Sequence, residues 1–326
     1  MIENFYQYCR HCTGATIRTP DATRAGESAV IDKLEMFIAL AQERHFGRAA
    51  EECGVTQPTL SAGLKQLEDQ LGVMLVWRGS RFRGLTPEGQ RVLEWARRIV
   101  GDARAMREEM RTARQGLSGN VRLAVIPTAL TMAERLTTPF RRRHPNVRFT
   151  IYARSSIEIL AMLENLEIEA GVTYLDNEPL GRVASVPLYR ERYMLLARAD
   201  DPLAARGSIG WAEVARLPLA LLTPDMQNRR IMNQHFAEVG HVAEPLLEAS
   251  SVIILASQVL SGEMCTILPS KLAALFLRMG GLAAIPVVAP EAEHQVGLVA
   301  PHRDPSTPVI AALLEEARRV AEEPAG

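Results

Sequence analysis

Four polar side chains near the start of one predicted helix have the chemistry needed to contact DNA. They are Gln57, Thr59, Ser61 and Lys65. Amide and hydroxyl groups of this length reach base edges in the major groove, whereas lysine pairs with phosphates. A polar face of this kind also occurs on ordinary solvated helices, so the neighbouring sequence has to distinguish the two interpretations.

The residues around this polar face predict a helix-turn-helix. Residues 48–53 form a short helix with two small alanines, and Gly54 allows a tight turn. Thr56 is suited to cap the next helix, and Pro58 suits its first turn. Four leucines at helical spacing give this helix a buried side: Leu60, Leu64, Leu67 and Leu71. We predict that the module contacts DNA through seven residues: Arg48, Thr56, Gln57, Pro58, Thr59, Ser61 and Lys65.

A segment without acidic residues, 70–87, follows the second helix. Its apolar start, residues 71–77, is strand-like, and a glycine-bounded tip carries Arg78, Arg81 and Arg83. Such a hairpin suits a wing that lies along phosphates or enters a minor groove. Arginines that are simply solvated are the alternative interpretation.

Several short motifs between residues 34 and 89 carry a resemblance to a known family. They are Phe46-x-Arg48-Ala49-Ala50-Glu51, Thr56-Gln57-Pro58-Thr59-Leu60-Ser61, Leu67-Glu68, Leu71-Gly72-Val73 and Leu85-Thr86-x-x-Gly89. Together they resemble the DNA-binding module of LysR-type transcriptional regulators. Two positions depart from that pattern: Val76-Trp77, where the family more often has Phe and then an acidic or polar residue, and Gly63, which is usually long and polar. We expect the glycine to soften base readout.

Residues 1–31 are predicted to be a disordered extension, because they lack periodicity and contain Thr, Gly and Pro breaks. Cys9-Arg10-His11-Cys12 offers metal-ligand atoms, but no second Cys/His pair follows at zinc-finger spacing, so we predict no metal site. Apolar residues then recur at helical spacing from Asp32: Leu34, Phe37, Ile38 and Ala41. They predict the first core helix of a DNA-binding domain over residues 32–88. The resemblance implies a chain that begins near Val30.

A heptad pattern predicts a long dimerisation helix over residues 89–116. Small or apolar residues alternate at spacings of four and three: Val92, Ala96, Ile99, Ala103, Met106, Met110, Ala113 and Leu117. A helix of this length spans about 45 Å. Packing of this helix on the chain's own effector domain is the alternative. LysR-type proteins place their dimer-forming linker helix here, and two recognition helices on a two-fold axis read an inverted repeat.

The C-terminal part alternates strand-like and helical segments, as in an open parallel sheet. The first strands are predicted at residues 121–126, 147–152 and 170–174. We divide this part into effector lobe I, residues 120–195 plus 290–326, and effector lobe II, residues 196–289. The LysR resemblance, weaker here, implies a two-lobed α/β domain similar to periplasmic binding proteins. The predicted fold is therefore α+β multidomain: an N-terminal all-α winged helix-turn-helix, a long linker helix and this effector domain.

Small polar residues follow several of the predicted strands. Ligands of open parallel sheets bind beyond the carboxyl ends of the strands, where helix N-termini favour anions. Plain helix capping is an equally strong alternative for each hydroxyl. The candidate effector-binding residues are Thr128, Ser155, Ser156, Met226, Gln227, Asn228 and Ser251. None of them is charged, but hydroxyls, amides and helix N-termini together can hold a small carboxylate without an arginine, so we expect a compact organic acid, from formate-sized ligands to dicarboxylates.

Composition and missing motifs narrow the functional classes. The 326-residue chain has a net charge of −1, so DNA binding must come from local patches. The four cysteines do not form a disulfide framework, and no signal-peptide or membrane-spanning pattern is present, which favours a cytoplasmic protein. No metalloprotease, Walker or nucleophile-elbow motif is present, so we predict no catalytic residues, no cofactor and no enzymatic activity. An exported solute receptor would not need the N-terminal module, and an architectural DNA binder would not need the two lobes.

The combined prediction is a ligand-responsive DNA-binding transcriptional regulator. It would bind an interrupted inverted repeat at promoters, and a small metabolite in the effector cleft would change DNA bending or polymerase recruitment. The expected partners are double-stranded DNA, a small-molecule inducer and a second copy of the chain through the linker helix. Family behaviour implies a homotetramer, and RNA polymerase is a further candidate partner.

Overall fold

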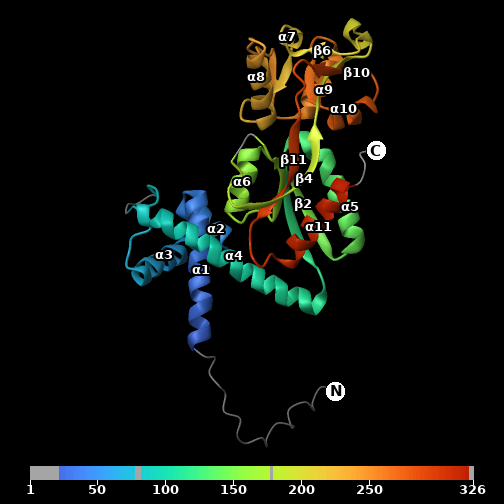
Figure 1. The fold of residues 1–326 in the computed structure, drawn as a ribbon. Coiled ribbons are helices and arrows are strands. Elements are labelled where there is room, and N and C mark those ends of the chain that lie inside the picture. Colours follow the sequence, from blue (N-terminus) through green and yellow to red (C-terminus); the bar gives the residue numbers. More distant parts are fainter. Residues whose placement is uncertain (1–21, 78–81, 177–178, 323–326) are drawn as a thin grey trace, which may run out of the picture. The chain divides into compact units, whose positions relative to one another are not determined.

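The computed structural model describes residues 22–77, 82–176 and 179–322 of the chain (Figure 1). The chain divides into two compact units, which meet between Ala103 and Arg104. The first unit is mainly helical, and the second contains mixed α/β sheets. Within the described residues, no helix combines the length and the apolar character that crossing a membrane requires.

The first unit is a helix-turn-helix with a short wing. Its elements are α1 (Ala22–Glu43), α2 (Phe46–Glu52), α3 (Gln57–Leu71) and the start of α4 (Pro87–Gln115). Phe37, Leu40 and Leu60 are fully buried in its core. An antiparallel bridge pairs Val76 with Leu85 and forms the base of the wing. The fold is therefore the winged helix-turn-helix that the sequence predicts.

Helix α1 begins earlier than predicted. The expected start was Asp32, with residues 1–31 as a disordered extension, but residues 22–31 already belong to the helix. This stretch contains no proline and three alanines, so its intrinsic preference does not oppose helix formation. Residues 1–21, which include the Cys9-Arg10-His11-Cys12 motif, lie outside the described residues.

The first lobe of the second unit is built on a five-stranded sheet with the order β2-β1-β3-β11-β4. Its strands are β1 (Gly119–Val125), β2 (Val147–Ala153), β3 (Ala170–Tyr174), β4 (Val183–Glu191) and β11 (His294–Pro301). Strand β1 pairs parallel with both β2 and β3, whereas β11 runs antiparallel between β3 and β4. All five residues of β3 are buried, as expected for a strand covered on both faces.

Three helices surround this sheet: α5 (Leu130–Arg143), α6 (Ser156–Glu164) and α11 (Pro308–Glu322). Helix α11 packs on β4 and α5, and α6 packs on β3. A short 3-10 turn, η1 (Pro127–Ala129), joins β1 to α5. The carboxyl ends of β1 and β2 are therefore each followed by the start of a helical segment.

The second lobe contains a four-stranded sheet with the order β6-β10-β5-β9 and a two-stranded sheet, β7-β8. Its strands are β5 (Tyr193–Arg198), β6 (Ile209–Gly210), β7 (Ala220–Leu222), β8 (Leu247–Ala249), β9 (Thr266–Pro269) and β10 (Leu282–Val288). Its helical segments are η2 (Pro202–Ala205), α7 (Trp211–Val214), α8 (Gln227–Glu238), α9 (Val252–Ser261) and α10 (Ser270–Leu277).

The chain crosses between the two lobes twice. The first crossing is at Arg192, because Glu191 ends β4 of the first lobe and Tyr193 begins β5 of the second. The predicted boundary at residue 196 was therefore too late by a few residues, since the apolar run from Tyr193 already pairs within the second sheet. The second crossing lies between Val288 and His294.

Candidate functional site

The start of helix α3 presents the polar face that the sequence predicts. Thr56 has extended backbone angles and caps the helix, because its Oγ1 accepts a hydrogen bond from the Thr59 backbone N–H at 3.4 Å. The two threonine hydroxyls are 2.8 Å apart. Gln57, Ser61 and Lys65 are exposed, as is Pro58. The side chains of Gln57, Ser61 and Lys65 are therefore open to solvent, whereas the Thr59 hydroxyl already bonds to the cap.

Helix α2 is held in place by a cap that the sequence reasoning missed. The Nδ1 atom of His45 accepts hydrogen bonds from the backbone N–H groups of Gly47 and Arg48 at 3.1 and 3.3 Å. The Arg48 Nε lies 2.7 Å from Glu43 Oε2, and the arginine side chain stays largely exposed. A phosphate would therefore compete with Glu43 for this guanidinium. Histidine is a less common cap than Ser, Thr, Asp or Asn, which explains why the sequence signal was weak.

Two residues of α3 lie differently from the prediction. Leu71 is 46% exposed, because the helix ends at Gly72 in a left-handed conformation (φ 69°), beyond the core formed by Leu60, Leu64 and Leu67. Gly63 faces helix α1: a Cβ atom there would lie 2.8 Å from the Met36 Sδ. The glycine therefore lets α1 and α3 approach closely. The expected effect of Gly63 on base readout stays a prediction.

The base of the wing is bonded to helix α3. The Glu68 carboxylate accepts hydrogen bonds from the backbone N–H groups of Leu75 and Val76 at 2.7 and 3.3 Å. Thr86 is buried, donates to the Met74 carbonyl and accepts from the Gly89 N–H. Arg83 is exposed, whereas Arg78 and Arg81 lie outside the described residues.

Helix α4 carries an exposed apolar stripe. Trp95, Ile99, Met106 and Met110 have exposed fractions of 62%, 44%, 60% and 56%. Ala96, which the predicted heptad seam included, is fully buried instead, together with Leu93 and Val100 in the unit's own core. The exposed stripe therefore runs through Trp95 and Ile99 rather than through Ala96. Large exposed apolar side chains spaced along one helix are typical of surfaces that contact another protein.

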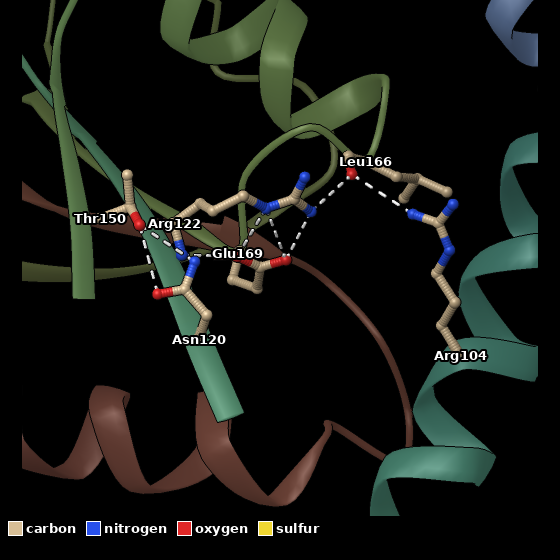
Figure 2. A network of polar contacts seen from close by, with 6 residues as sticks. All are labelled: Arg104, Asn120, Arg122, Thr150, Leu166 and Glu169. Atoms are coloured by element: carbon tan, nitrogen blue, oxygen red, sulfur yellow. Dashed lines mark hydrogen bonds and ion pairs between the residues drawn. The ribbon is translucent and has the colours of Figure 1, made fainter. Parts of the chain in front are cut away.

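The second half of α4 is bonded to the first lobe (Figure 2). Arg122 of β1 contacts Glu169 at 2.7 Å and donates to the Leu166 carbonyl at 3.0 Å. Arg104 of α4 donates to the same carbonyl at 3.4 Å. Farther along α4, burial raises the pKa of the Glu108 carboxyl group, and its Oε1 atom is buried without a hydrogen-bond partner among the described residues.

A small cavity lies beyond the carboxyl ends of the strands of the effector unit. The empty space among its lining atoms, open solvent included, is about 200 Å³. The lining residues are Ile126, Pro127, Thr128, Ser155, Ser156, Tyr174, Leu222, Met226, Gln227 and Asn228. Six of the seven predicted effector residues are therefore brought together: Thr128, Ser155, Ser156, Met226, Gln227 and Asn228. Ser251, the seventh, does not line this cavity and instead occupies the N-cap position of α9.

Some polar groups of the cavity are hydrogen-bonded within the protein, whereas others have no partner in the described part of the chain. Ser155 closes a capping box with Glu158, so its hydroxyl donates to that carboxylate at 2.8 Å and the capping interpretation is correct for this residue. The Ser156 hydroxyl and the Asn228 Oδ1 are buried and have no hydrogen-bond partner among the described residues. Buried polar atoms without partners are rare in proteins and indicate a missing ligand or water. Both atoms belong to residues that line the cavity, which supports its assignment as a binding site.

Tyr174 and Glu191 form a buried pair next to this cavity, and the sequence reasoning named neither. Tyr174 lines the cavity, receives a hydrogen bond from the Asn228 Nδ2 at 3.2 Å and donates to Glu191 Oε2 at 2.6 Å. The Tyr189 hydroxyl donates to the other carboxylate oxygen at 3.1 Å. Burial raises the pKa of Glu191 to about 7. A tyrosine at a strand end was a weak signal, because tyrosines are common in strand cores.

Two histidines meet between the lobes. The Nε2 atoms of His235, on α8, and His294, on β11, are 3.0 Å apart. His235 also contacts Glu238 at 2.9 Å, and burial lowers the pKa of His294. Among the described residues, no group of three or more His, Cys, Asp or Glu side chains is arranged to hold a metal ion.

Comparison with protein families gives two matches that together cover most of the chain. Residues 31–90 match the model described as "Bacterial regulatory helix-turn-helix protein, lysR family". Residues 114–322 match the model described as "LysR substrate binding domain". These ranges coincide with the winged helix-turn-helix and with the two-lobed effector unit.

Individual relatives agree with the family matches. The chain is 28% identical over 270 residues to the DNA-binding transcriptional dual regulator OxyR of Escherichia coli, which covers 82% of this chain and 88% of the relative. It is similar in structure to a cysteine-to-aspartate variant of full-length OxyR from Pseudomonas aeruginosa, with a TM-score of 0.70 and 27% identity over 88% of this chain and 94% of that one. It also shares the fold of CbnR in complex with its target DNA, with a TM-score of 0.58 and 21% identity over 89% and 99% of the two chains.

Proposed function

Because the chain belongs to the LysR family of bacterial transcriptional regulators, we propose that α3 reads DNA and that the cavity of the effector unit binds a small-molecule effector. The protein is a DNA-binding transcriptional regulator with an effector-binding domain. We assign DNA binding to residues 32–88, dimerisation to residues 89–116 and effector binding to the two lobes from residue 120 onward. In this assignment the chain has no catalytic role and acts in the cytoplasm, on double-stranded DNA.

The exposed polar start of α3 supports the DNA-reading role. Gln57 and Ser61 contact base edges in this proposal, Lys65 contacts phosphate, and the exposed Arg48 and Arg83 extend the phosphate contacts to both sides. The full proposed set also contains Thr56, Pro58, Thr59, Arg78 and Arg81. Thr56 and Thr59 act mainly by fixing the helix start, because their hydroxyls bond to each other.

The exposed apolar stripe on α4 supports dimerisation. A second copy of the helix would cover Trp95, Ile99, Met106 and Met110, which a single chain leaves in solvent. Two modules related by a two-fold axis would then bind an interrupted inverted repeat, and pairing of dimers would give a tetramer. A gel-shift titration against full and half sites tests this proposal. Tight binding of one monomer to an isolated half-site would contradict it.

The two unpartnered buried atoms, Ser156 Oγ and Asn228 Oδ1, are the observation that carries the effector proposal. The cavity is small and lined by uncharged residues, and α6 and α8 begin at its wall. We propose a compact ligand, a small carboxylate, that is held by hydroxyl and amide groups and by backbone N–H groups at these helix starts. Replacing Thr128 with Val should abolish the ligand response of transcription and leave DNA binding intact. Loss of DNA binding in this variant would mean that Thr128 is structural.

Some relatives are named hydrogen peroxide-inducible genes activators, but we do not propose that this protein senses peroxide at the cavity. In the described part of the chain no cysteine lines the cavity, and burial raises the pKa of the Cys265 thiol to about 11. The nucleophile in such chemistry is the thiolate, which a raised pKa disfavours at neutral pH. A small non-oxidising metabolite therefore fits this cavity better.

The contacts between α4 and the first lobe support a route for the response. Ligand binding changes how the two lobes close, and the first lobe is bonded to α4 through Arg104. Movement of α4 would change the spacing of the paired DNA-binding modules and so alter DNA bending or the recruitment of RNA polymerase. Ligand-dependent DNA bending, measured by energy transfer between labelled DNA ends, tests this step. An unchanged bend at saturating ligand would contradict it.

A further inference from the structure

The Tyr174 hydroxyl connects the effector cavity to a buried carboxyl group at the crossing between the lobes. On the cavity side it accepts a hydrogen bond from the Asn228 Nδ2 at 3.2 Å and lies 3.4 Å from the Thr128 Oγ1. On the other side it donates to Glu191 at 2.6 Å. Glu191 is 1% exposed and is the last residue of β4 before the chain enters the second lobe. The state of this carboxyl group therefore determines how Tyr174 presents its hydroxyl.

The direction of these hydrogen bonds depends on one proton. An ionised carboxylate only accepts hydrogen bonds, so it takes the Tyr174 proton and leaves the tyrosine oxygen as an acceptor toward the cavity. A protonated Glu191 carboxyl can instead donate to the Tyr174 oxygen. The tyrosine proton is then free to point into the cavity, which Ser156 with its unpartnered hydroxyl also lines. Protonation of Glu191 thus adds a hydrogen-bond donor to the cavity and removes a negative charge behind it.

We propose that Glu191 acts through Tyr174 as a specificity-determining residue, so that a carboxylate ligand enters this cavity together with one proton. The proton comes from solvent and ends on the Glu191 carboxyl oxygen, and no covalent bond of the ligand changes. This inference rests on the proposed function of the cavity as the effector site. A neutral ligand that donates hydrogen bonds would have no such requirement.

Within the part of the chain that the structure describes, no cationic side chain lies where it could neutralise Glu191 or a carboxylate ligand in the cavity, so a proton has to compensate the negative charge. No residue that lines the cavity is charged, and Glu191 has no ion-pair partner among the described residues. The titratable and charged groups that face Glu191 come from several packed elements: Tyr174, Asp176, Tyr189, Tyr193 and His294. Lys271 of α10 lies over the Tyr189 ring, 5.0 Å from its centre.

These surrounding groups do not stabilise an ionised Glu191 fully. Burial disfavours the charged form of both Glu191 and His294 and likewise lowers the pKa of Lys271, and Asp176 repels the Glu191 carboxylate. The pKa of Glu191 is consequently raised to about 7. A second negative charge in the adjacent cavity raises it further, because like charges in a buried site disfavour each other. The affinity for a carboxylate ligand should therefore rise as pH falls. Above the pKa of Glu191 it should decrease by up to about tenfold per pH unit.

Acetate and acetamide are suitable probes, because they have nearly the same shape and differ in charge. We would titrate the full-length protein with each by calorimetry at about pH 8, in two buffers with different heats of ionisation. The expected result is uptake of about one proton per acetate bound and none per acetamide. Acetate binding without proton uptake, or preferential binding of acetamide at every pH, would overturn the inference. This measurement uses the unmodified chain and does not depend on the folding of a variant.

The Glu191→Gln variant provides a second test of the same inference. An amide keeps the shape and stays neutral, so acetate affinity should become independent of pH and equal to that of the parent protein at about pH 6. Glu322→Gln, an exposed position at the end of α11, is the matched control and should keep the pH dependence of the parent. A pH slope that persists in Glu191→Gln would assign the proton to another group, such as His294, and would overturn the proposal.

Infrared difference spectra between the parent protein and Glu191→Gln report the protonation of Glu191 without any ligand. They therefore test the proton site independently of the proposed effector function. The parent should show a protonated carboxyl band that grows between about pH 8.5 and pH 6 and is missing in the variant. If neither probe binds, the proposed carboxylate effector fails, and the spectra then decide the state of Glu191. A parent protein without this band would overturn the proton inference whichever ligand the cavity binds.

Discussion

The carbonyl oxygen of Leu75 lies so close to Gly89 that a Cβ atom on residue 89 would be only 2.0 Å away from it. Gly89 is buried in the first turn of α4, and Leu75 is the fully buried residue at the base of the wing. The contact joins the wing to the linker helix. It also gives the Leu85-Thr86-x-x-Gly89 motif a physical reason, because Thr86 caps the helix whose first turn must accept the wing backbone.

Gly89→Ala should separate the wing from α4. A methyl group against a backbone carbonyl cannot be relieved by rotating a side chain, so we expect a loss of about 3 kcal/mol in the free energy of unfolding. Thermal unfolding and DNA binding check this prediction. Gly207→Ala is the control, because nothing lies within 4 Å of a Cβ there. Equal stability of the two variants would show that the Leu75 contact can relax.

Lys65→Ala and Gln57→Ala should weaken DNA binding in different ways. Loss of the lysine removes one phosphate contact, so affinity should decrease for all sequences and the slope of binding against salt should fall by about one. Loss of the glutamine removes a base contact, which should cost about 1–3 kcal/mol on the specific site and little on random DNA. Salt-dependent fluorescence anisotropy separates the two. Indistinguishable profiles would contradict the assignment of these roles.

Ile99→Asp should prevent dimerisation through α4. A carboxylate placed in an apolar dimer seam is costly to bury, so we expect dissociation to monomers at micromolar concentration. Sedimentation velocity measures this directly. Gln90→Asp adds the same charge nine residues earlier, on the opposite side of the helix at 100° per residue, and should leave the dimer intact. A dimeric Ile99→Asp protein would move the interface to another surface.

Ser156→Ala should weaken the ligand response without weakening the fold. The Ser156 hydroxyl has no partner among the described residues, so its removal sacrifices no internal hydrogen bond. Loss of a hydrogen bond to the ligand should raise the half-maximal effector concentration by about tenfold, which corresponds to about 1.4 kcal/mol. A reporter assay together with thermal unfolding tests both halves. Ser251→Ala is the control, since Ser251 does not line the cavity, and a similar loss of response there would contradict the site.

Glu191 should make the stability of the effector unit depend on pH. Its pKa is about 7 in the folded chain and 4.5 in the reference state, so the folded state binds more protons between these values. Stability should therefore fall as pH rises from about 4.5 to about 7, by at most about 3 kcal/mol, and change little from this group above that range. Denaturant unfolding of the parent and of Glu191→Gln measures the difference. Parallel curves for the two proteins across this range would contradict the prediction.

Much of the N-terminal module could be predicted because its signals are local. The cap at Thr56, the turn at Gly54 and the buried leucines of α3 depend on residues within a few positions of one another. The same holds for the polar residues after the first strands, since a strand followed by a helix start places Thr128 and Ser156 at one sheet edge. The early start of α1 was missed because propensity over residues 22–31 is weak in either direction.

The remaining features depend on partners that are distant in sequence. Whether Ala96 or Trp95 faces outward on α4 is settled by which side of that helix the DNA-binding core covers, and a heptad pattern tolerates both. Tyr174 meets Glu191 because β11 returns from residue 294 and inserts between their strands, an order that no local pattern encodes. The types and spacing of its residues thus specify this chain as a two-part regulator. Only the tertiary structure decides which side chains line the cavity and that Glu191 is buried beside them. Packing between distant segments removes these side chains from water and so sets their hydrogen bonds and pKa values.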